Sequence, residues 1–363
     1  MKSLDQLVDK ALSRRNFLAG AGATAAAVGL AGCSGGGAPI VTPTSPTSPT
    51  STYTDADVLN FALNLEYLEA QFYLYAATGK GLAASDTAAP TGYTGTYTMG
   101  TVTTNSTVTA VTGASAAQMA IINEIAFEEQ EHVKFLRAAL GSAAVPMPNI
   151  DLTFFGPLAM VAGVTTVATG TGSFSPFASF DAFLIGSFIF EDVGVSAYLG
   201  AAPLITAAGV TSGYLTAAAG ILAVEAYHAA YVRTSLTGRA IAMGATSPTS
   251  TVYPYVGIAN QVEALRATLT VGASGAPSAT NNTGNTGQTS TSASVEVPLN
   301  VPQGPVSSTT PSAIVACDSD RAIAFARTVN QVHHIVYGSA TVGVNKGGFF
   351  PNGTNSIFAT TTA

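Results

Sequence analysis

The segment Ile122–Leu140, INEIAFEEQEHVKFLRAAL, contains a Glu-x-x-His pair formed by Glu129 and His132. Its apolar residues recur at spacings near three and four, which predicts a helix. Residues three apart lie on one face of a helix, so both side chains can bind one metal ion from a single turn. Taken alone, the pair fits a solvated acidic helix with an incidental histidine at least as well.

A second Glu-x-x-His pair, Glu225 and His228, appears about a hundred residues later. It lies in Thr211–Leu236, TSGYLTAAAGILAVEAYHAAYVRTSL, an Ala-rich segment that is also expected to be a helix. The chain has only 4 His. Because two of them follow a Glu by three residues, each in a predicted helix, chance is a poor explanation of the pattern.

Two further predicted helices each carry a Glu followed seven residues later by a Tyr. They are Val58–Thr78, expected to begin at an N-cap Asp55 or Asp57, and Ser179–Ala202. The second is apolar almost all the way round, which is typical of a buried helix. A carboxylate there is costly unless it is paired or binds metal. The Glu/Tyr pairs are Glu66/Tyr73 and Glu191/Tyr198.

The order Glu-x6-Tyr and then Glu-x-x-His therefore occurs twice, which indicates an internal duplication. The first copy has the longer internal gap, by roughly the length of Gly81–Gly113. This Tyr-, Thr- and Gly-rich segment is predicted to be a β-hairpin or another β-like insertion. The long connection Val145–Ser179, with a short helix or turn at Leu158–Val164, fits a crossover between two helix pairs. Glu69 shares a face with Glu66, and the sequence leaves open which of the two is the ligand.

The C-terminal part gives weaker signals. Helical pieces are expected at Ile258–Thr268 and Asp318–Tyr337, on either side of a polar, uncharged tract, Gly272–Thr310, that is predicted to be irregular. His333 and His334 have no Glu three residues before them, so core or surface roles are expected for both.

Four carboxylates and two imidazoles that face inward suit two divalent ions, with positions left open for O2 or peroxide. Oxygen and nitrogen ligands without thiolates favour iron or manganese.

The helix NFALNLEYLEAQFY, the segment EHVKFLR and the closing GGFFPNG resemble the ferritin-like superfamily. More narrowly, they resemble bacterial ferritin-like domain proteins akin to plant desiccation-related proteins, over roughly Asp55–Arg239. The resemblance implies an all-α, ferritin-like four-helix bundle that binds two Fe or Mn ions. It implies Tyr73 and Tyr198 as candidate catalytic residues that hydrogen-bond ligand carboxylates. The implied metal ligands are Glu66, Glu129, His132, Glu191, Glu225 and His228.

The N-terminus indicates export. Ser13–Leu18, SRRNFL, resembles a twin-arginine signal, and Leu30–Cys33, LAGC, resembles a lipobox whose Cys33 would carry lipid. An ordinary secretory peptide with a chance Cys is the alternative. The expected organisation is a signal (1–32), a disordered tether (33–54), the bundle (55–240, with insertion 81–113) and a C-terminal extension packing on it (241–363). The protein is expected in the periplasm or cell envelope, where the lipid on Cys33 would anchor it to the membrane.

Composition excludes one class of partner. Charged residues make up 9% of the chain, against roughly 25% in typical soluble domains. The net charge is -7 and the basic residues are scattered, so nucleic acid is not an expected partner.

Two functions remain: a ferroxidase-like or peroxide-consuming oxidoreductase, or a non-catalytic envelope scaffold with a structural or absent metal. A homo-oligomer is compatible with both.

Overall fold

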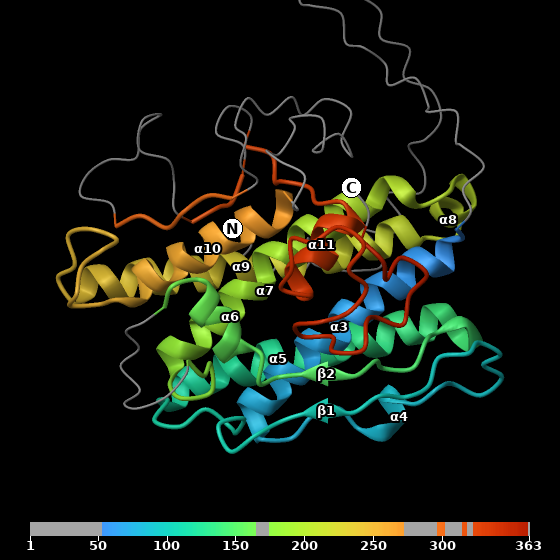
Figure 1. Cartoon of the computed structure of the whole chain (residues 1–363), viewed down its shortest axis with the longest axis horizontal. Helices are drawn as coiled ribbons and strands as arrows, with labels where there is room; N and C mark the ends of the chain where they lie inside the picture. Colours follow the sequence, from blue (N-terminus) through green and yellow to red (C-terminus); the bar gives the residue numbers. More distant parts are fainter. Residues whose placement is uncertain (1–52, 165–173, 272–295, 302–313, 318–321, 362–363) are drawn as a thin grey trace, which may run out of the picture. The chain divides into compact units, whose positions relative to one another are not determined.

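Four long helices form two packed pairs in the computed structural model, α3 (Asp55–Thr78) with α5 (Ala116–Leu140) and α7 (Phe180–Ala201) with α9 (Tyr214–Ala242) (Figure 1). The two pairs meet through α3 and α7. The structure describes residues 53–164, 174–271, 296–301, 314–317 and 322–361, all within the compact unit Ser48–Ala363. The expected all-α four-helix bundle is confirmed.

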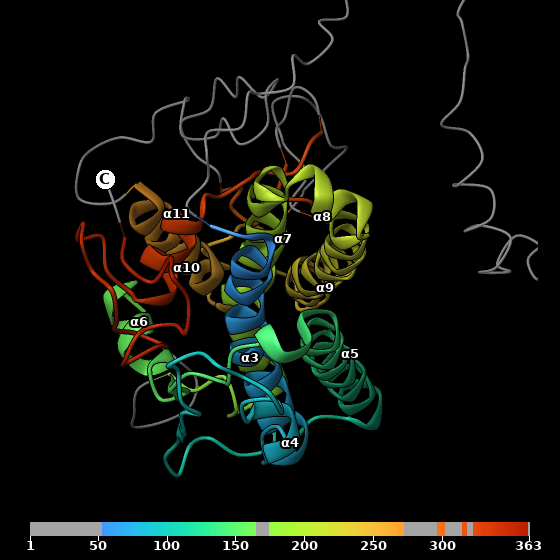
Figure 2. The ribbon, with the colours of Figure 1, turned by 90° about the vertical axis from the view of Figure 1, so that its right-hand side faces the viewer.

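Helices α3 and α7 are covered on two sides. Figure 2 shows α5 and α9 on one side of them, and α6 (Phe155–Val161), α10 (Tyr255–Val271) and α11 (Val329–Val336) on the other. Both α10 and α11 pack against α7. This double covering explains why α7 is apolar all round and why nearly all of its residues are buried. Polar side chains on either central helix must therefore find partners inside the protein.

Capping residues set the ends of α3 and α5. Thr54, rather than Asp55 or Asp57, is the N-cap of α3, because its hydroxyl accepts from the Asp57 backbone while the Asp57 carboxylate accepts from the Thr54 backbone. The expectation of an Asp N-cap was wrong. Ser115 caps α5 in the same way, and Gly79 ends α3 in the left-handed conformation (φ 71°).

The insertion after α3 is not a β-hairpin. It contains the short helix α4 (Ala84–Thr87) and the two-residue strand β1 (Val102–Thr103), and the rest is loop. Strand β1 pairs in parallel with β2 (Ile150–Asp151), which belongs to the connection after α5. The hairpin prediction was wrong because the partner strand comes from another segment, which local sequence does not reveal.

The remaining elements differ from expectation mainly in length. The 3-10 helix Ala202–Leu204 and α8 (Ala207–Thr211) join α7 to α9. Helix α10 is longer than expected, whereas α11 begins only after its N-cap Thr328. Ala322 has a φ of 55°, outside helical values, and Ala324 forms an antiparallel bridge with Cys317, so the predicted helix Asp318–Tyr337 was too long.

Several predicted features lie outside the described residues. They include the signal, Cys33 and nearly all of the tether, as well as 318–321 of the predicted last helix and all of the polar tract Gly272–Thr310 except 296–301.

Candidate metal centre

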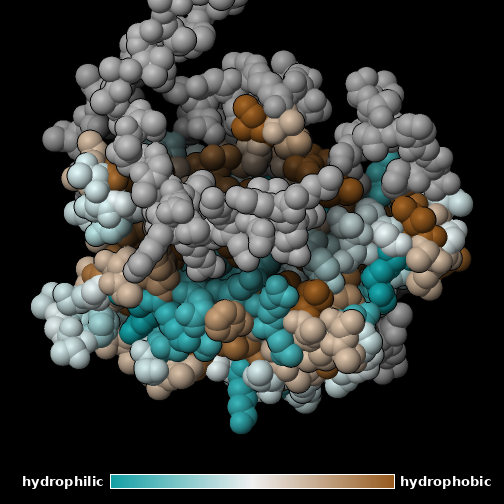
Figure 3. All heavy atoms as spheres, turned by 180° about the vertical axis from the view of Figure 1, so that it is seen from behind, coloured by the Kyte–Doolittle hydropathy of each residue, from teal (hydrophilic) through white to brown (hydrophobic). Residues whose placement is uncertain are grey.

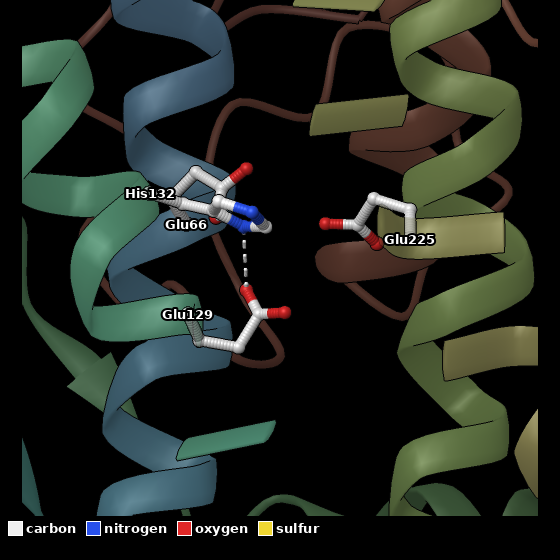
Figure 4. A group of neighbouring side chains, drawn as sticks. All are labelled: Glu66, Glu129, His132 and Glu225. Carbon is white, nitrogen blue, oxygen red and sulfur yellow. Dashed lines mark ion pairs between the residues drawn. The ribbon is translucent and has the colours of Figure 1, made fainter. Parts of the chain in front are cut away.

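The structure brings the six predicted ligands together between the helix pairs. Their ligand atoms form two groups, each within 4.8 Å, in which every residue is buried. Figure 4 shows Glu225 reaching from α9 toward side chains of α3 and α5. The first group is Glu66, Glu129, His132 and Glu225, and the second is Glu129, Glu191 and His228. We call these six residues, of which Glu129 belongs to both groups, the carboxylate centre.

Glu129 belongs to both groups because its two oxygens face different imidazoles. Its Oε2 lies 3.4 Å from His132 Nδ1, and its Oε1 lies 3.1 Å from His228 Nδ1. A carboxylate in this position can bridge two ions. Each imidazole also approaches a second carboxylate: His132 Nδ1 lies 3.2 Å from Glu66 Oε2, and His228 Nδ1 lies 3.4 Å from Glu191 Oε2.

The two candidate catalytic tyrosines cross between the halves of the duplication. Tyr73 on α3 donates its hydroxyl hydrogen to Glu191 Oε1 on α7, and Tyr198 on α7 donates to Glu66 Oε1 on α3. In each glutamate the other oxygen, Oε2, is left facing an imidazole. Both tyrosines therefore orient candidate ligands, and each links the two central helices.

Glu128 orients His228 from outside the centre. Its Oε2 lies 2.7 Å from His228 Nε2, which leaves Nδ1 directed at the centre. The neighbouring acids on α5 have other surroundings: Glu131 pairs with Lys134 at 2.8 Å, and Glu124 is exposed. Glu128 thus affects the carboxylate centre by orienting His228.

Burial and charge shift the protonation of the centre in opposite directions. Burial would raise the pKa of Glu129, but His132 and His228 lower it to about 2. Burial would lower the pKa of both histidines, but the glutamates raise it to about 11 for His132 and about 12 for His228. Burial raises the pKa of Glu66 to about 7 and that of Glu225 well above its ordinary value. When no metal ion is bound, protons must therefore offset the negative charge of the carboxylates.

Buried polar atoms without a hydrogen-bond partner indicate whether metal ions fit the carboxylate centre. Both carboxylate oxygens of Glu225 are buried without a hydrogen-bond partner. The same holds for both oxygens of Glu129, for one oxygen each of Glu66 and Glu191, and for Nδ1 of both histidines. Such groups are costly to bury unless something compensates them. Hard oxygen ligands with one imidazole in each group fit two iron or manganese ions.

A cavity of about 300 Å³ opens beside the centre between α5 and α9. His228, Glu128, Glu124, Tyr227 and Tyr231 are among the residues that line it. Figure 3 shows this face of the protein, where hydrophilic residues gather in a band over α5. Small molecules can therefore approach the centre from the His228 side.

Sequence reasoning missed a second buried polar group. On α7, Asp192 follows Glu191 directly but points away from the carboxylate centre to Arg233 Nη1 (2.8 Å) and Arg266 Nη2 (3.1 Å). Arg266 also binds Glu296 (2.7 Å), which pairs with Arg327. We call these five residues the arginine cluster. The available signal was the occurrence of Arg233 and Arg266 in predicted helical segments of a chain with only 13 Lys and Arg.

The two remaining histidines take no part in the centre. Both are buried in α11, where His333 Nε2 lies 3.1 Å from Thr354 Oγ1 and His334 Nδ1 lies 2.6 Å from the Ser339 carbonyl oxygen. Burial lowers the pKa of His333 to about 3, so it is neutral. The sequence left core and surface roles open for both histidines, and the structure places both in the core.

Comparison with known proteins agrees with this geometry. The ferritin-like domain family matches residues 54–238. The chain is 31% identical over 187 residues to the desiccation-related protein PCC13-62 of Craterostigma plantagineum, covering 52% of this chain and 54% of that protein. It is 25% identical over 313 residues to the ferritin-like catalase Nec2 of Nesocodon mauritianus, covering 84% and 85%. The chain thus spans about half the length of the first relative. No solved structure matches the chain.

Proposed function

We propose a function on the premise that the chain belongs to the ferritin-like domain family. The carboxylate centre binds two Fe or Mn ions, and the loaded protein consumes peroxide. Oxidation of Fe2+ by O2 is the related activity that the same ligands would support. The observation that carries the proposal is the set of buried carboxylate oxygens without a hydrogen-bond partner, with Glu129 shared between the two ligand groups.

The bound ions would supply the redox change by which two molecules of peroxide become one of O2 and two of water. The chain's own residues prepare the site. Glu129 holds two positions at a fixed separation, while Tyr73 and Tyr198 fix the ligand oxygens of Glu191 and Glu66. Glu128 holds His228 with Nδ1 inward, so less reorganisation is needed when an ion binds.

The cavity between α5 and α9 supports a small, uncharged substrate. Its volume of about 300 Å³ is ample for peroxide, and it reaches His228. Glu124 and Glu128 on its wall favour cations and neutral molecules over anions. The same path would serve Fe2+ or Mn2+ on its way to the ligands.

The relatives support two functions. The name ferritin-like catalase belongs to the relative that matches over most of both chains, which favours peroxide as substrate. The other relative is named for desiccation, and its higher identity favours a role in desiccation or stress protection, which is the alternative function. For this chain we further propose export by the twin-arginine route and anchoring in the cell envelope through lipid on Cys33.

The test is O2 release after peroxide is added to protein loaded with Mn2+ or Fe2+. Wild-type protein should release O2, whereas Glu129→Gln, which removes one charge from both ligand groups, should bind less of both ions and release little. Glu131→Gln is the matched control, because Glu131 is on the same helix but pairs with Lys134 at the surface. Fully loaded protein that releases no O2 and consumes no peroxide would contradict the proposed activity.

A further inference from the structure

Glu69 is a buried carboxylate that the two ligand groups leave out. It lies one helical turn after Glu66 on α3, on the same face, and is 5% exposed. Within the part of the chain that the structure describes, its carboxylate forms no hydrogen bond and no ion pair. Burial of an unpaired carboxylate is costly, so a compensating partner is expected.

The charges that act on Glu69 are those of the carboxylate centre. Glu129, Glu66 and Glu191 oppose its ionisation, and His132 favours it. In turn, Glu69 is the group whose charge acts most strongly on Glu225. Glu69 is therefore within electrostatic range of the centre, and the imidazole that favours its ionisation is that of His132, in the first group.

The duplication shows what the second half has at the matching position. Glu69 follows Glu66 by three residues, and Gly194 follows Glu191 by three. A Cβ atom at Gly194 would lie 2.1 Å from Oε2 of Glu225, so glycine leaves the space that Glu225 occupies. One half thus adds a carboxylate where the other removes a side chain. The two metal positions are built unequally.

We propose that Glu69 is an additional ligand of the metal position formed by Glu66, Glu129, His132 and Glu225, and makes it the tighter of the two. The position formed by Glu129, Glu191 and His228 has fewer protein ligands and lies at the cavity, so it binds the small molecule. This inference rests on the proposed dimetal function. It explains why a carboxylate is buried in a region that already has an excess of negative charge.

The experiment is a titration of the metal-free, full-length protein with Mn2+ alone. Binding is measured by calorimetry and by the electron paramagnetic resonance signal of free Mn2+. Wild-type protein should bind in two steps. Glu69→Gln keeps the side chain's shape but removes the charge, so it should weaken the first step by about 10–100-fold and spare the second. It should also raise the Tm of the metal-free protein. Glu131→Gln, on the surface, should change neither.

The outcomes separate this inference from the function on which it rests. Wild-type affinities in Glu69→Gln, with a higher Tm, would mean that Glu69 only fills space, and weakening of the second step alone would place it at the wrong ion. Either result overturns the inference and spares the dimetal function, whereas wild-type protein that binds no Mn2+ or Fe2+ defeats both. If Glu69→Gln does not fold, Glu69→Asp provides the test: a weaker first step supports the inference, and unchanged binding overturns it.

Discussion

Two neighbouring residues of α7 lead to two opposite kinds of buried polar cluster. Glu191 points into the carboxylate centre, where several oxygens have no hydrogen-bond partner. Asp192 points into the arginine cluster, where three guanidinium groups face two carboxylates. Burial would raise the pKa of Asp192, but Arg233 and Arg266 lower it below its ordinary value, whereas the pKa of Glu191 is raised by burial despite His228.

The difference distinguishes a structural cluster from a binding site. The arginine cluster supplies its own cations, and Arg327 binds Ser196 Oγ (2.8 Å) in addition to Glu296. It fastens the segments around 296 and 327 to α7, α9 and α10. The carboxylate centre has more carboxylates than imidazoles, so it awaits cations from outside. Substitutions in either cluster test this difference.

The largest effect is expected from Glu225→Ala combined with His228→Ala, which should abolish binding of both ions at micromolar concentration. The pair removes a ligand from each group. Metal content after dialysis against excess Mn2+ or Fe2+ is the measurement. Glu131→Ala with Lys134→Ala is a matched control, since it removes a pair of the same spacing from the surface of α5. Unchanged metal content in the first variant would show that the site lies elsewhere.

Arg266→Met should destabilise the fold without changing metal stoichiometry. It removes the guanidinium that binds both Asp192 and Glu296, and the loss of two buried hydrogen bonds between charged groups costs about 3 kcal/mol or more. Denaturant unfolding of the metal-free protein gives the free energy, and metal analysis of the folded fraction gives the stoichiometry. A loss below about 1 kcal/mol would contradict the view that this cluster holds the fold together.

Glu128→Ala should weaken metal binding by about 10–100-fold at the His228 position alone, because Nε2 of this histidine loses the group that orients it. In the second copy the position of Glu128 is taken by Val224, so no matching effect is expected at His132. Mn2+ titration resolves the two steps. Equal weakening of both steps would contradict this assignment.

The smallest effect concerns Glu263, beside the arginine cluster, whose pKa is raised from 4.5 to about 7 by burial and by the charge of Glu296. The unfolded chain loses this proton near pH 4.5, whereas the folded protein keeps it until about pH 7, so this group's contribution to stability falls across that window. Glu263→Gln should lack that decrease. Its Tm relative to wild type should therefore be higher above pH 7 than at pH 4.5, and a constant difference would refute the prediction.

The repeated Glu-x-x-His and Glu-x6-Tyr spacings were enough to predict the four helices and to propose six ligands. These signals are local, since one helical turn brings residues three apart together. The pairing of Tyr73 with Glu191 is not local. A tyrosine seven residues after a glutamate lies roughly 10 Å further along its own helix, so each reaches the glutamate of the other half.

The features that sequence reasoning missed depend on distant segments. Strand β1 finds its partner in the connection after α5, and the arginine cluster joins residues from three helices and two C-terminal segments. The late start of the last helix depends on Ala322 and on the bridge between Cys317 and Ala324, both of which precede it. None of these has a periodic signal, because tertiary packing decides them.

Metal analysis of protein purified from its native host tests most directly whether the carboxylate centre is a dimetal site. We expect about two Fe or Mn ions per chain, removable by chelators and restored by either metal. Protein that contains neither metal, and that binds neither when it is supplied, would show that the centre is not a dimetal site.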